Sequence, residues 1–309
     1  MRVVFLGSGA FAIPSLAALI DAGHEVAAVF TQPDREKGRG RALAPPPLKP
    51  VAQARGVPVH QPRRVREEPA QAALRGLAPD VQVVVAYGQI LPRSVIDIPR
   101  HGTVNVHASL LPLYRGAAPV QWAIVNGEHE TGVTTMLIDE GLDTGPTLLA
   151  RSTPIGAEET AALLEPRLAV LGAELLLETL AGLGAGTLRP TAQDHARATL
   201  APLIRKEDGR IDWSMPAEAV ARRVRGFHPW PGTFTTWQGQ PLKVLRARAE
   251  GEGTEAPGQI AVVDRQGLLV GCGQGTRLRL LEVQPESRRP MGAAAFAAGL
   301  RLGPGARFG

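Results

Sequence analysis

Short valine-rich runs alternate with helical patterns through the first part of the chain, and this alternation restricts the possible folds more than any other feature. The run Val81-Gln82-Val83-Val84-Val85-Ala86 is apolar on both faces, as a central strand between two layers of helices has to be. Similar runs occupy residues 3–6, 26–30, 57–60 and 104–107. The pattern predicts an α/β fold with a doubly wound, mostly parallel sheet. Ligands bind such sheets beyond the carboxyl ends of the strands, so site residues are expected after Ala86, around His107 and around Asp143.

A long helical pattern from about Glu158 to Leu180 stops at the glycine-rich residues 182–186, which predicts the end of a first domain. Pro166 lies inside the pattern and is expected to kink the helix or to interrupt it. We place a first domain at residues 1–189, a linker at 190–205 and a second domain at 206–309. In the second domain, short strand-like runs separated by glycine, proline and aspartate predict a small β-barrel: residues 234–237, 242–248, 259–263, 268–270 and 278–283.

With 309 residues, of which 44% are hydrophobic, the chain can bury a substantial core. No apolar run reaches the roughly 18 residues of a membrane-spanning helix, and Met1 leads directly into a predicted strand instead of a signal peptide. We therefore expect a cytoplasmic protein with no membrane partner. The single cysteine, Cys272, excludes an internal disulfide and a multi-cysteine metal site, and it is expected to be a small buried hydrophobe.

The formal net charge of +5 is unevenly distributed. Residues 1–189 contain 17 basic and 18 acidic side chains, whereas residues 190–309 contain 17 basic and 11 acidic ones. Such an asymmetry indicates that the second part approaches a polyanion such as a nucleic acid. Arginine-rich surfaces also serve for solubility alone, so composition leaves both interpretations open.

Asn105 and His107 lie two residues apart in a predicted strand, so their side chains point to one face while those of Val104 and Val106 point to the other. Taken alone, such a pair can simply satisfy backbone groups at the end of a strand. The turn-rich residues 109–119 follow directly, however, as expected of a loop that shapes a pocket. Later, the glycine-bracketed loop 139–145 supplies carboxylates that can reach the imidazole.

Two stretches, Asn105-Val106-His107-Ala108-Ser109-Leu110-Leu111-Pro112 and Gly141-Leu142-Asp143-Thr144-Gly145, resemble the active-site signature of the 10-formyltetrahydrofolate-dependent formyltransferases. Residues 30–34, 85–88, 211–213 and 229–232 extend the resemblance along nearly the whole chain, toward the members of this family that act on methionyl initiator tRNA. Relatives that act on glycinamide ribonucleotide are similar to the first domain only. The resemblance implies a Rossmann-like catalytic domain followed by an OB-like barrel that binds tRNA.

The resemblance implies that Asn105, His107 and Asp143 form the catalytic trio and that the reaction needs no metal. Donors on Asn105 and His107 suit the oxygen of a formyl group, because negative charge develops there when an amine attacks the carbon. Asp143 can then stabilise the imidazolium form of His107. These motifs do not determine which group moves which proton.

The resemblance also implies a pocket for a reduced folate, whose flat pterin ring needs apolar walls and backbone hydrogen bonds. The residues that it assigns to this pocket are Ser109, Leu110, Leu111, Pro112, Tyr87, Gly88, Ile90, Leu91 and Asp139.

A cationic, glycine-containing loop at residues 34–49 includes Lys37, Arg39 and Arg41. Its composition fits a solvated loop without a single conformation, and it also fits an arm that becomes ordered on contact with RNA phosphates. The resemblance favours RNA contact by these three cations. It adds Lys206 near the junction of the two domains.

Arg222, Arg223 and Arg225 lie on a predicted helix and can extend a cationic track. A charged, solvent-facing helix surface explains them equally well.

Gly7-Ser8-Gly9-Ala10-Phe11-Ala12 follows the first predicted strand and superficially matches a dinucleotide-binding fingerprint. An NAD site needs an acid at the end of the second strand, but the first acid there is Asp34, beyond a proline. We interpret the stretch as a tight turn from strand to helix. A dinucleotide-binding oxidoreductase is retained as the alternative from a different class.

Together, the residues and the resemblance predict a monomeric enzyme that transfers the formyl group of 10-formyltetrahydrofolate to the amino group of methionyl initiator tRNA for translation initiation. The closest alternative is a formyltransferase that acts on a sugar-nucleotide amine. Such an enzyme shares Asn105, His107 and Asp143 but has no use for the basic loop.

Overall fold

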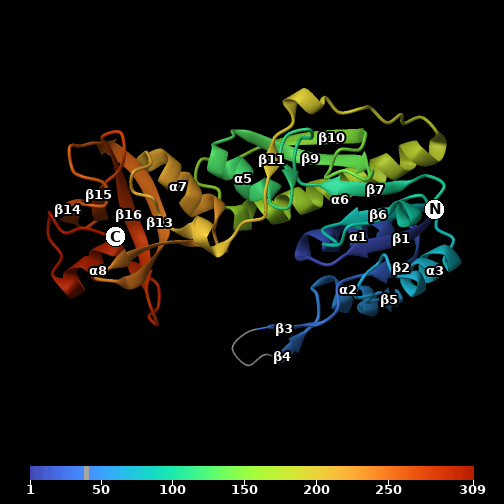
Figure 1. Cartoon of the computed structure of the whole chain (residues 1–309), viewed down its shortest axis with the longest axis horizontal. Helices are drawn as coiled ribbons and strands as arrows, with labels where there is room; N and C mark the ends of the chain where they lie inside the picture. The colour runs from blue at the N-terminus through green and yellow to red at the C-terminus, as the bar shows by residue number, and fades with distance from the viewer. Residues whose placement is uncertain (38–41) are drawn as a thin grey trace. The chain divides into compact units, whose positions relative to one another are not determined.

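The computed structural model describes residues 1–37 and 42–309, which divide into two compact units (Figure 1). The first unit comprises Met1–Pro119, Glu130–Thr153 and Glu165–Ala201. The second comprises Val120–His129, Pro154–Leu164 and Pro202–Gly309. Most of the segment that the sequence indicates as a linker, up to Ala201, therefore packs within the first unit.

Seven strands form the sheet of the first unit, in the order β10-β9-β7-β6-β1-β2-β5. The pairs β1–β2, β1–β6, β2–β5 and β6–β7 are parallel, whereas β9 is antiparallel to β7. This order confirms the doubly wound, mostly parallel sheet, and every residue of β6 is buried as its sequence predicts. The strands are β1 (Arg2–Gly7), β2 (Glu25–Phe30), β5 (Val59–His60), β6 (Val81–Val85), β7 (Thr103–His107), β9 (Glu130–Leu137) and β10 (Thr147–Pro154).

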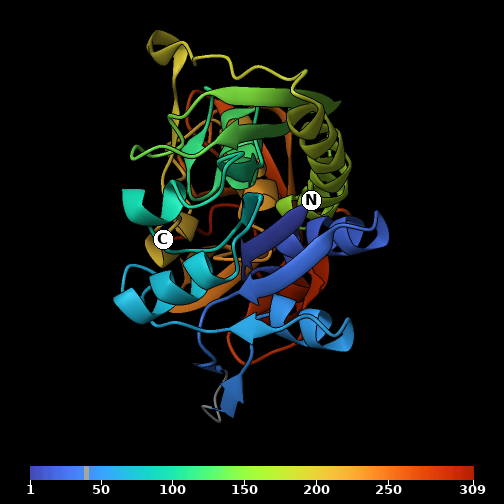
Figure 2. The same ribbon diagram turned by 90° about the vertical axis from the view of Figure 1, so that its right-hand side faces the viewer.

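Helices cover both faces of this sheet (Figure 2). One face carries Val4, Leu6 and Phe30, which join Leu74 of α3 and Val95 of α4 in a single buried cluster. The burial of these apolar faces is the main favourable contribution to the stability of the layers. The helices of this unit before β7 are α1 (Ile13–Asp21), α2 (Leu48–Ala54), α3 (Glu68–Gly76) and α4 (Arg93–Ile96), whereas α5 (Pro119–Asn126) belongs to the second unit from Val120 onward.

The long helix α6 (Ala161–Ala185) continues through Pro166 and through the first glycines of the glycine-rich run. It ends before Gly186, whose φ of +67° is the left-handed conformation that glycine adopts readily after a helix. The last glycine of the run, not Gly182, therefore ends the helix.

By length and composition alone, α6 is apolar enough to cross a membrane, contrary to the expectation that no segment of the chain is. Its exposed residues Glu174 and Glu178 pair with Arg151 of β10, and Gly172 packs against Val106 and Val133 of the sheet. Its buried positions recur every three or four residues, as in a helix that packs on a sheet by one side: they include Leu164, Leu168, Leu175, Leu176, Thr179 and Leu180. We therefore interpret α6 as a core helix of the first unit.

The cationic loop contains two short strands, β3 (Arg35–Lys37) and β4 (Ala42–Ala44), which pair antiparallel. The described part of the loop thus has regular structure, which its composition did not predict. Asp34 anchors the base, because its carboxylate accepts hydrogen bonds from Gln61 Nε2 at 2.6 Å and from Lys49 Nζ at 2.9 Å. These bonds lower the pKa of Asp34.

The second unit contains an antiparallel sheet in the order β12-β13-β16-β15-β14, with β17 paired to β16. The strands are β12 (Thr233–Trp237), β13 (Gln240–Glu252), β14 (Ile260–Asp264), β15 (Gly267–Gly271), β16 (Thr276–Pro285) and β17 (Met291–Gly292). The first five coincide with the five strand-like runs predicted for this region, whereas β17 was not predicted.

Residues 306–309 connect the two edges of this sheet. Gly309 exchanges two backbone hydrogen bonds with Thr236 of the edge strand β12, at 3.0 and 3.2 Å. On the other edge, Ala306 accepts a hydrogen bond from Ile260 of β14 at 2.7 Å, and Phe308 donates one to Gly258 at 2.9 Å. The edges are thereby paired instead of exposed, as in the predicted small barrel.

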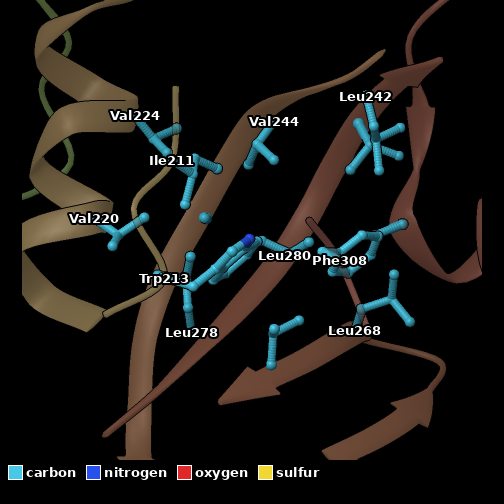
Figure 3. Close-up of a cluster of buried hydrophobic side chains, with 14 of the residues drawn as sticks. Ile211, Trp213, Val220, Val224, Leu242, Val244, Leu268, Leu278, Leu280 and Phe308 are labelled. Atoms are coloured by element: carbon cyan, nitrogen blue, oxygen red, sulfur yellow. The ribbon is translucent and has the colours of Figure 1, made fainter. Parts of the chain in front are cut away.

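Apolar side chains fill the interior of the second unit (Figure 3). Trp213 stacks on Phe308 with ring centroids 5.8 Å apart, and its Nε1 donates a hydrogen bond to Thr235 at 3.0 Å. Helices α7 (Ala217–Gly226) and α8 (Ala293–Leu300) contribute further buried residues. Cys272 belongs to this core, and burial raises the pKa of its thiol to about 12, as expected of a structural cysteine.

A network of ion pairs lies on the same sheet around Arg279, whose side chain is only 5% exposed. Its guanidinium donates to Glu250 at 2.6 Å and to Asp264 at 2.8 Å. The hydrogen bonds from Arg279 and then Arg248 lower the pKa of Glu250 to about 2. The carboxylate form of Glu250 therefore stabilises the folded state.

We expect Glu250→Gln to lower the free energy of unfolding at pH 7 by about 1 to 3 kcal/mol, because it weakens charged hydrogen bonds to a buried guanidinium. The folded pKa lies below the ordinary value of 4.5, so this contribution is present above pH 4.5 and is lost as the pH falls toward 2. Urea unfolding of both proteins between pH 7 and pH 3 measures the difference. The difference in unfolding free energy should shrink below pH 4.5. The control Glu286→Gln, at an exposed turn, should differ little from the wild type at every pH. A difference for Glu250→Gln that stays constant with pH contradicts the prediction.

Candidate active site

His107 is the last residue of β7, and its side chain is buried, with 6% of its surface exposed. Its Nε2 lies 2.9 Å from the backbone oxygen of Tyr114, and its Nδ1 lies 3.7 Å from Oδ2 of Asp143. Because a carbonyl oxygen only accepts hydrogen bonds, we infer that Nε2 carries a proton in this contact. Nδ1 is then the nitrogen that faces the carboxylate, and a second proton there makes the ring a cation paired with Asp143.

The carboxylate of Asp143 has a second partner. Its Oδ2 accepts a hydrogen bond from the backbone nitrogen of Gly116 at 2.8 Å. The backbone of Asp143 has a φ of +51°, a left-handed conformation that is uncommon outside glycine and often occurs at functional sites. The predicted meeting of Asp143 and His107 is therefore present, together with a strained backbone and a backbone donor.

The loop that carries Asp143 does not follow a strand that runs parallel to β7. Since β9 is antiparallel to β7, its last residue, Leu137, lies opposite Val104, and Ile138 donates a hydrogen bond to Thr103 at 2.8 Å. Thr103 is four residues from His107, which is roughly 13 Å along a strand. The loop 138–146 must therefore run back along the sheet to bring Asp143 to the imidazole.

Asn105 lies in the middle of β7, opposite Val84 of β6 and Met136 of β9. It is half-buried, and strand geometry directs its side chain to the same face as that of His107, as predicted. Within the described part of the chain, its amide makes no hydrogen bond. The amide is thus free to donate to a ligand.

The loop after His107 is held by its own polar groups. The buried Ser109 donates from Oγ to the carbonyl of Leu113 at 2.6 Å, and Thr134 donates to the carbonyl of Ser109 at 2.7 Å. Ser109 therefore shapes the loop and does not present its hydroxyl to a ligand. Leu110, Leu111 and Pro112 are half-buried, so part of their apolar surface stays accessible.

The loop after β6 divides into core residues and exposed residues. The side chains of Tyr87 and Leu91 are buried in the cluster under α3 and α4, and the carbonyl of Tyr87 already accepts hydrogen bonds from Ser8 and Gln32. Gly88 is exposed with a φ of +77°, and the side chain of Ile90 is 91% exposed. Of these four residues, only Gly88 and Ile90 present surface to a ligand.

The loop that contains Asp143 is shaped by Asp139. Oδ1 of Asp139 accepts hydrogen bonds from the backbone of Gly141 at 3.0 Å and from Thr144 Oγ1 at 2.7 Å. Leu142, one residue before Asp143, has a 63% exposed side chain. Asp139 therefore supports the loop, while Leu142 adds an exposed apolar group that the sequence did not single out.

The predicted tRNA contacts lie on different elements. Lys37 is the last residue of β3, and Lys206 is exposed in the short 3-10 helix η3 (Lys206–Gly209) of the second unit. Arg39 and Arg41 lie outside the described residues.

The three arginines of α7 are all half-buried and contact the second unit itself. Arg222 donates to the carbonyl of Val125 at 3.3 Å, and Arg225 donates to that of Glu159 at 3.4 Å. Arg223 donates to the carbonyl of Asp208 at 3.2 Å and lies over the ring of Phe227. These contacts favour a structural role over a cationic track.

The glycine-containing turn after β1 joins the ends of three strands. Ser8 Oγ donates to the carbonyl of Tyr87 at 3.2 Å and accepts from the backbone of Gln32 at 3.1 Å. A Cβ on Gly7 would lie 2.9 Å from the carbonyl oxygen of Val85. The turn therefore packs tightly against β6, as the structural interpretation predicts.

The sequence did not reveal three groups at the site: the carbonyl of Tyr114, the backbone nitrogen of Gly116 and the side chain of Gln193. Gln193 donates to the carbonyls of Asp143 and Gly145 at 2.9 and 2.7 Å. Two of these groups are backbone atoms, which have no side-chain signature. Gln193 lies in the segment indicated as a linker, 50 residues beyond its partner.

Gly116 has no room for a side chain, since a Cβ would lie 2.6 Å from the carbonyl oxygen of Ala201, and its φ is +124°. We expect Gly116→Ala to displace the donor to Asp143 and to lower the turnover of the formyl transfer implied by the resemblance by about 10- to 100-fold. Steady-state rates, with thermal unfolding followed in parallel, test this expectation. Gly186→Ala is the matched control, because Gly186 also has a positive φ but open space around it. Equal turnover in the two folded variants contradicts the prediction.

Comparison with known proteins shows the family of the chain. The profile of the family described as "Formyl transferase" matches residues 1–180, and that described as "Formyl transferase, C-terminal domain" matches residues 203–301. A methionyl-tRNA formyltransferase of Solibacter usitatus is 56% identical over 310 residues, covering 100% of this chain and 99% of the relative. A methionyl-tRNA formyltransferase of Geobacter sulfurreducens is 52% identical over 309 residues, covering 100% of this chain and 97% of the relative.

Among solved structures, HypX from Aquifex aeolicus in complex with tetrahydrofolic acid has a TM-score of 0.64 at 20% identity. The match covers 98% of this chain but 48% of HypX, so the chain spans about half the length of that protein. At this identity the likeness shows a shared fold. The two family profiles and the full-length identities decide the assignment: the chain belongs to the formyltransferase family, among the methionyl-tRNA formyltransferases.

Proposed function

We propose that the protein transfers the formyl group of 10-formyltetrahydrofolate to the α-amino group of methionyl initiator tRNA and so supplies N-formylmethionyl-tRNA for translation initiation. The observation that carries this proposal is identity of more than 50% with methionyl-tRNA formyltransferases over both units of the chain. A sugar-nucleotide formyltransferase and a dinucleotide-binding oxidoreductase are not favoured. We further propose that the enzyme is a cytoplasmic monomer.

In the proposed reaction, the amine nitrogen attacks the formyl carbon, and the C–O double bond becomes an alkoxide in a tetrahedral intermediate. The amide of Asn105 donates to this oxygen, where preorganised donors contribute most. His107 donates from Nε2, which exchanges the carbonyl of Tyr114 for the reacting oxygen. The bond to N10 of the folate then breaks as the carbonyl re-forms. The amine loses one proton and N10 gains one, so the formyl group and a proton exchange places.

Asp143 has two consequences for this step. Its carboxylate lies 3.7 Å from Nδ1 of His107 and so orients the imidazole for donation to the oxyanion. Directly or through a water molecule, it also offers a base for the proton that the amine releases. Within residues 1–37 and 42–309, no group of three or more His, Cys, Asp or Glu side chains is arranged to hold a metal ion. We propose a metal-free reaction, on the chemistry of the trio itself.

The apolar surfaces around the trio suit the pterin ring of a folate. Ile90 and Leu142 are large apolar side chains that are mostly exposed, in loops that follow β6 and β9. We propose that they form walls of the folate pocket together with Leu110, Leu111 and Pro112. Ser109, Tyr87, Leu91 and Asp139 then contribute by holding the backbone of these loops.

For the RNA, we propose that Lys37, Arg39 and Arg41 of the cationic segment 34–49 contact phosphates near the acceptor end and that Lys206 adds a further contact. The excess of basic residues after residue 189 supports an approach of the second unit to the polyanion. Such contacts add affinity for RNA without taking part in the chemistry.

Replacement of His107 tests the catalytic proposal. Transfer of formyl from 10-formyltetrahydrofolate to methionyl-tRNA is measured for the wild type and for His107→Ala, with folding monitored by circular dichroism. We expect kcat to fall by about 100- to 1,000-fold, because one oxyanion donor is lost. His101→Ala, a half-exposed histidine before β7, should retain activity. Full activity of folded His107→Ala rejects the assigned role.

Replacement of Arg39 tests the RNA contact. Arg39→Ala should raise the KM for methionyl-tRNA by about tenfold while KM for the folate stays constant, because loss of a phosphate contact weakens RNA binding only. The salt dependence of this KM should also become shallower. Arg265→Ala, in the exposed β14–β15 turn, serves as the control for loss of one positive charge. An equal effect of both variants excludes a specific contact at Arg39.

A further inference from the structure

Residues 191–201, which we call the strap, run alongside residues 114–116, which contact His107 and Asp143. The strap strand β11 (Leu200–Ala201) pairs in parallel with β8 (Arg115–Gly116). Thr199 accepts hydrogen bonds from the backbone nitrogens of Tyr114 and Arg115, at 2.8 and 2.9 Å. The strap therefore fixes residues 114–116, whose backbone contacts both His107 and Asp143.

Gln193 of the strap uses its whole side-chain amide in this region, and only 7% of the residue is exposed. Nε2 donates to the carbonyls of Asp143 and Gly145, at 2.9 and 2.7 Å. Oε1 accepts from the buried Arg115 guanidinium, at 3.1 Å from Nε and 2.7 Å from Nη2. One side chain thus joins the loop that carries Asp143 to the segment that contacts its carboxylate.

The contacts of Gln193 hold a loop that strand pairing does not hold near His107. The loop 138–146 starts beside Thr103, at the far end of β7, and Asp143 has a left-handed backbone that costs free energy outside glycine. Without an external anchor, nothing in strand pairing holds such a loop next to His107. The Gln193 amide binds the carbonyl of the strained residue itself.

We propose that Gln193 is a positioning residue for the formyl transfer: it locks the backbone of Asp143 so that the carboxylate stays between Gly116 and the His107 imidazole. This inference rests on the proposed function for its kinetic readout. Gln193 acts through Asp143 and does not touch the reacting atoms.

The side chain has to be an amide. A carboxylate in its place loses both donors and presents negative charge to the carbonyls of Asp143 and Gly145. An alanine leaves these two carbonyls and the Arg115 guanidinium without their partner, and buried polar groups without partners are costly. Gln193→Glu retains the acceptors for Arg115, so it isolates the loss of the contacts to the Asp143 loop.

The first experiment compares kcat and KM of the full-length wild type, Gln193→Ala and Gln193→Glu in formyl transfer to methionyl-tRNA. We expect kcat to fall by about 100-fold in both variants, as for a displacement of about 1 Å in a catalytic group, while both KM values change by less than about threefold. Gln71→Ala is the control, because Gln71 is also buried. Gln71 lies in α3, and its Nε2 donates to the carbonyl of Arg66 in the turn before that helix. Wild-type kcat in either folded Gln193 variant overturns the proposal.

A double-mutant cycle separates positioning from general stability. If Gln193 acts through Asp143, Gln193→Ala should lower kcat by less than about threefold in an Asp143→Asn background. If the fold-reductions in kcat of the two single variants multiply in the double variant, Gln193 acts independently of Asp143, and this result refutes the mechanism. Should Gln193→Ala fail to fold, the same cycle is carried out with the isosteric Gln193→Glu.

A third measurement does not depend on turnover. Hydrogen exchange of the backbone amides in residues 138–146 should be faster in Gln193→Glu than in the wild type and unchanged in Gln71→Ala. Unchanged exchange in Gln193→Glu contradicts the proposal. If the wild type transfers no formyl to methionyl-tRNA, the proposed function fails, and this exchange experiment still decides whether Gln193 holds the loop.

Discussion

The carboxylate of Asp143 can support the His107 imidazole only while the loop that carries it is held against β7, and much of the first unit provides that constraint. Because β9 is antiparallel to β7, strand pairing alone leaves the loop at the wrong end of β7. Its return is fixed by hydrogen bonds from Gly116 and Gln193. The 3.7 Å approach of Asp143 to His107 thus depends on residues that are 27 and 50 positions from Asp143 in sequence.

The remainder of the first unit supplies a rigid background for this contact. The buried strands β6 and β7 place Asn105 and His107 on one face, and Ser8 joins the ends of β1, β2 and β6. The loops that follow β6 and β9 expose apolar side chains at Ile90 and Leu142, whereas their polar groups are used to shape the backbone. The candidate residues thus lie at the end of a strand and in loops, where ligands usually bind in sheets of this kind.

The second unit shows how a basic composition can be misleading at single positions. The arginines of α7 donate to carbonyls of neighbouring segments, and Arg279 is buried between two carboxylates. These cations have partners within the unit itself. Lys206, in contrast, is exposed. The excess positive charge is still a property of this part of the chain.

The sequence by itself determined the parallel strands, strands β12 to β16 of the second unit, and the identity of the candidate residues Asn105, His107 and Asp143, because periodicity and local motifs act over a few neighbouring residues. Only the tertiary structure decided the route of the Asp143 loop, the end of α6 at Gly186, the pairing of residues 306–309 with both sheet edges, and the place of Gln193. Each of these depends on hydrogen bonds between segments that are distant in sequence, or on one backbone angle. Neither leaves a pattern in the residues themselves.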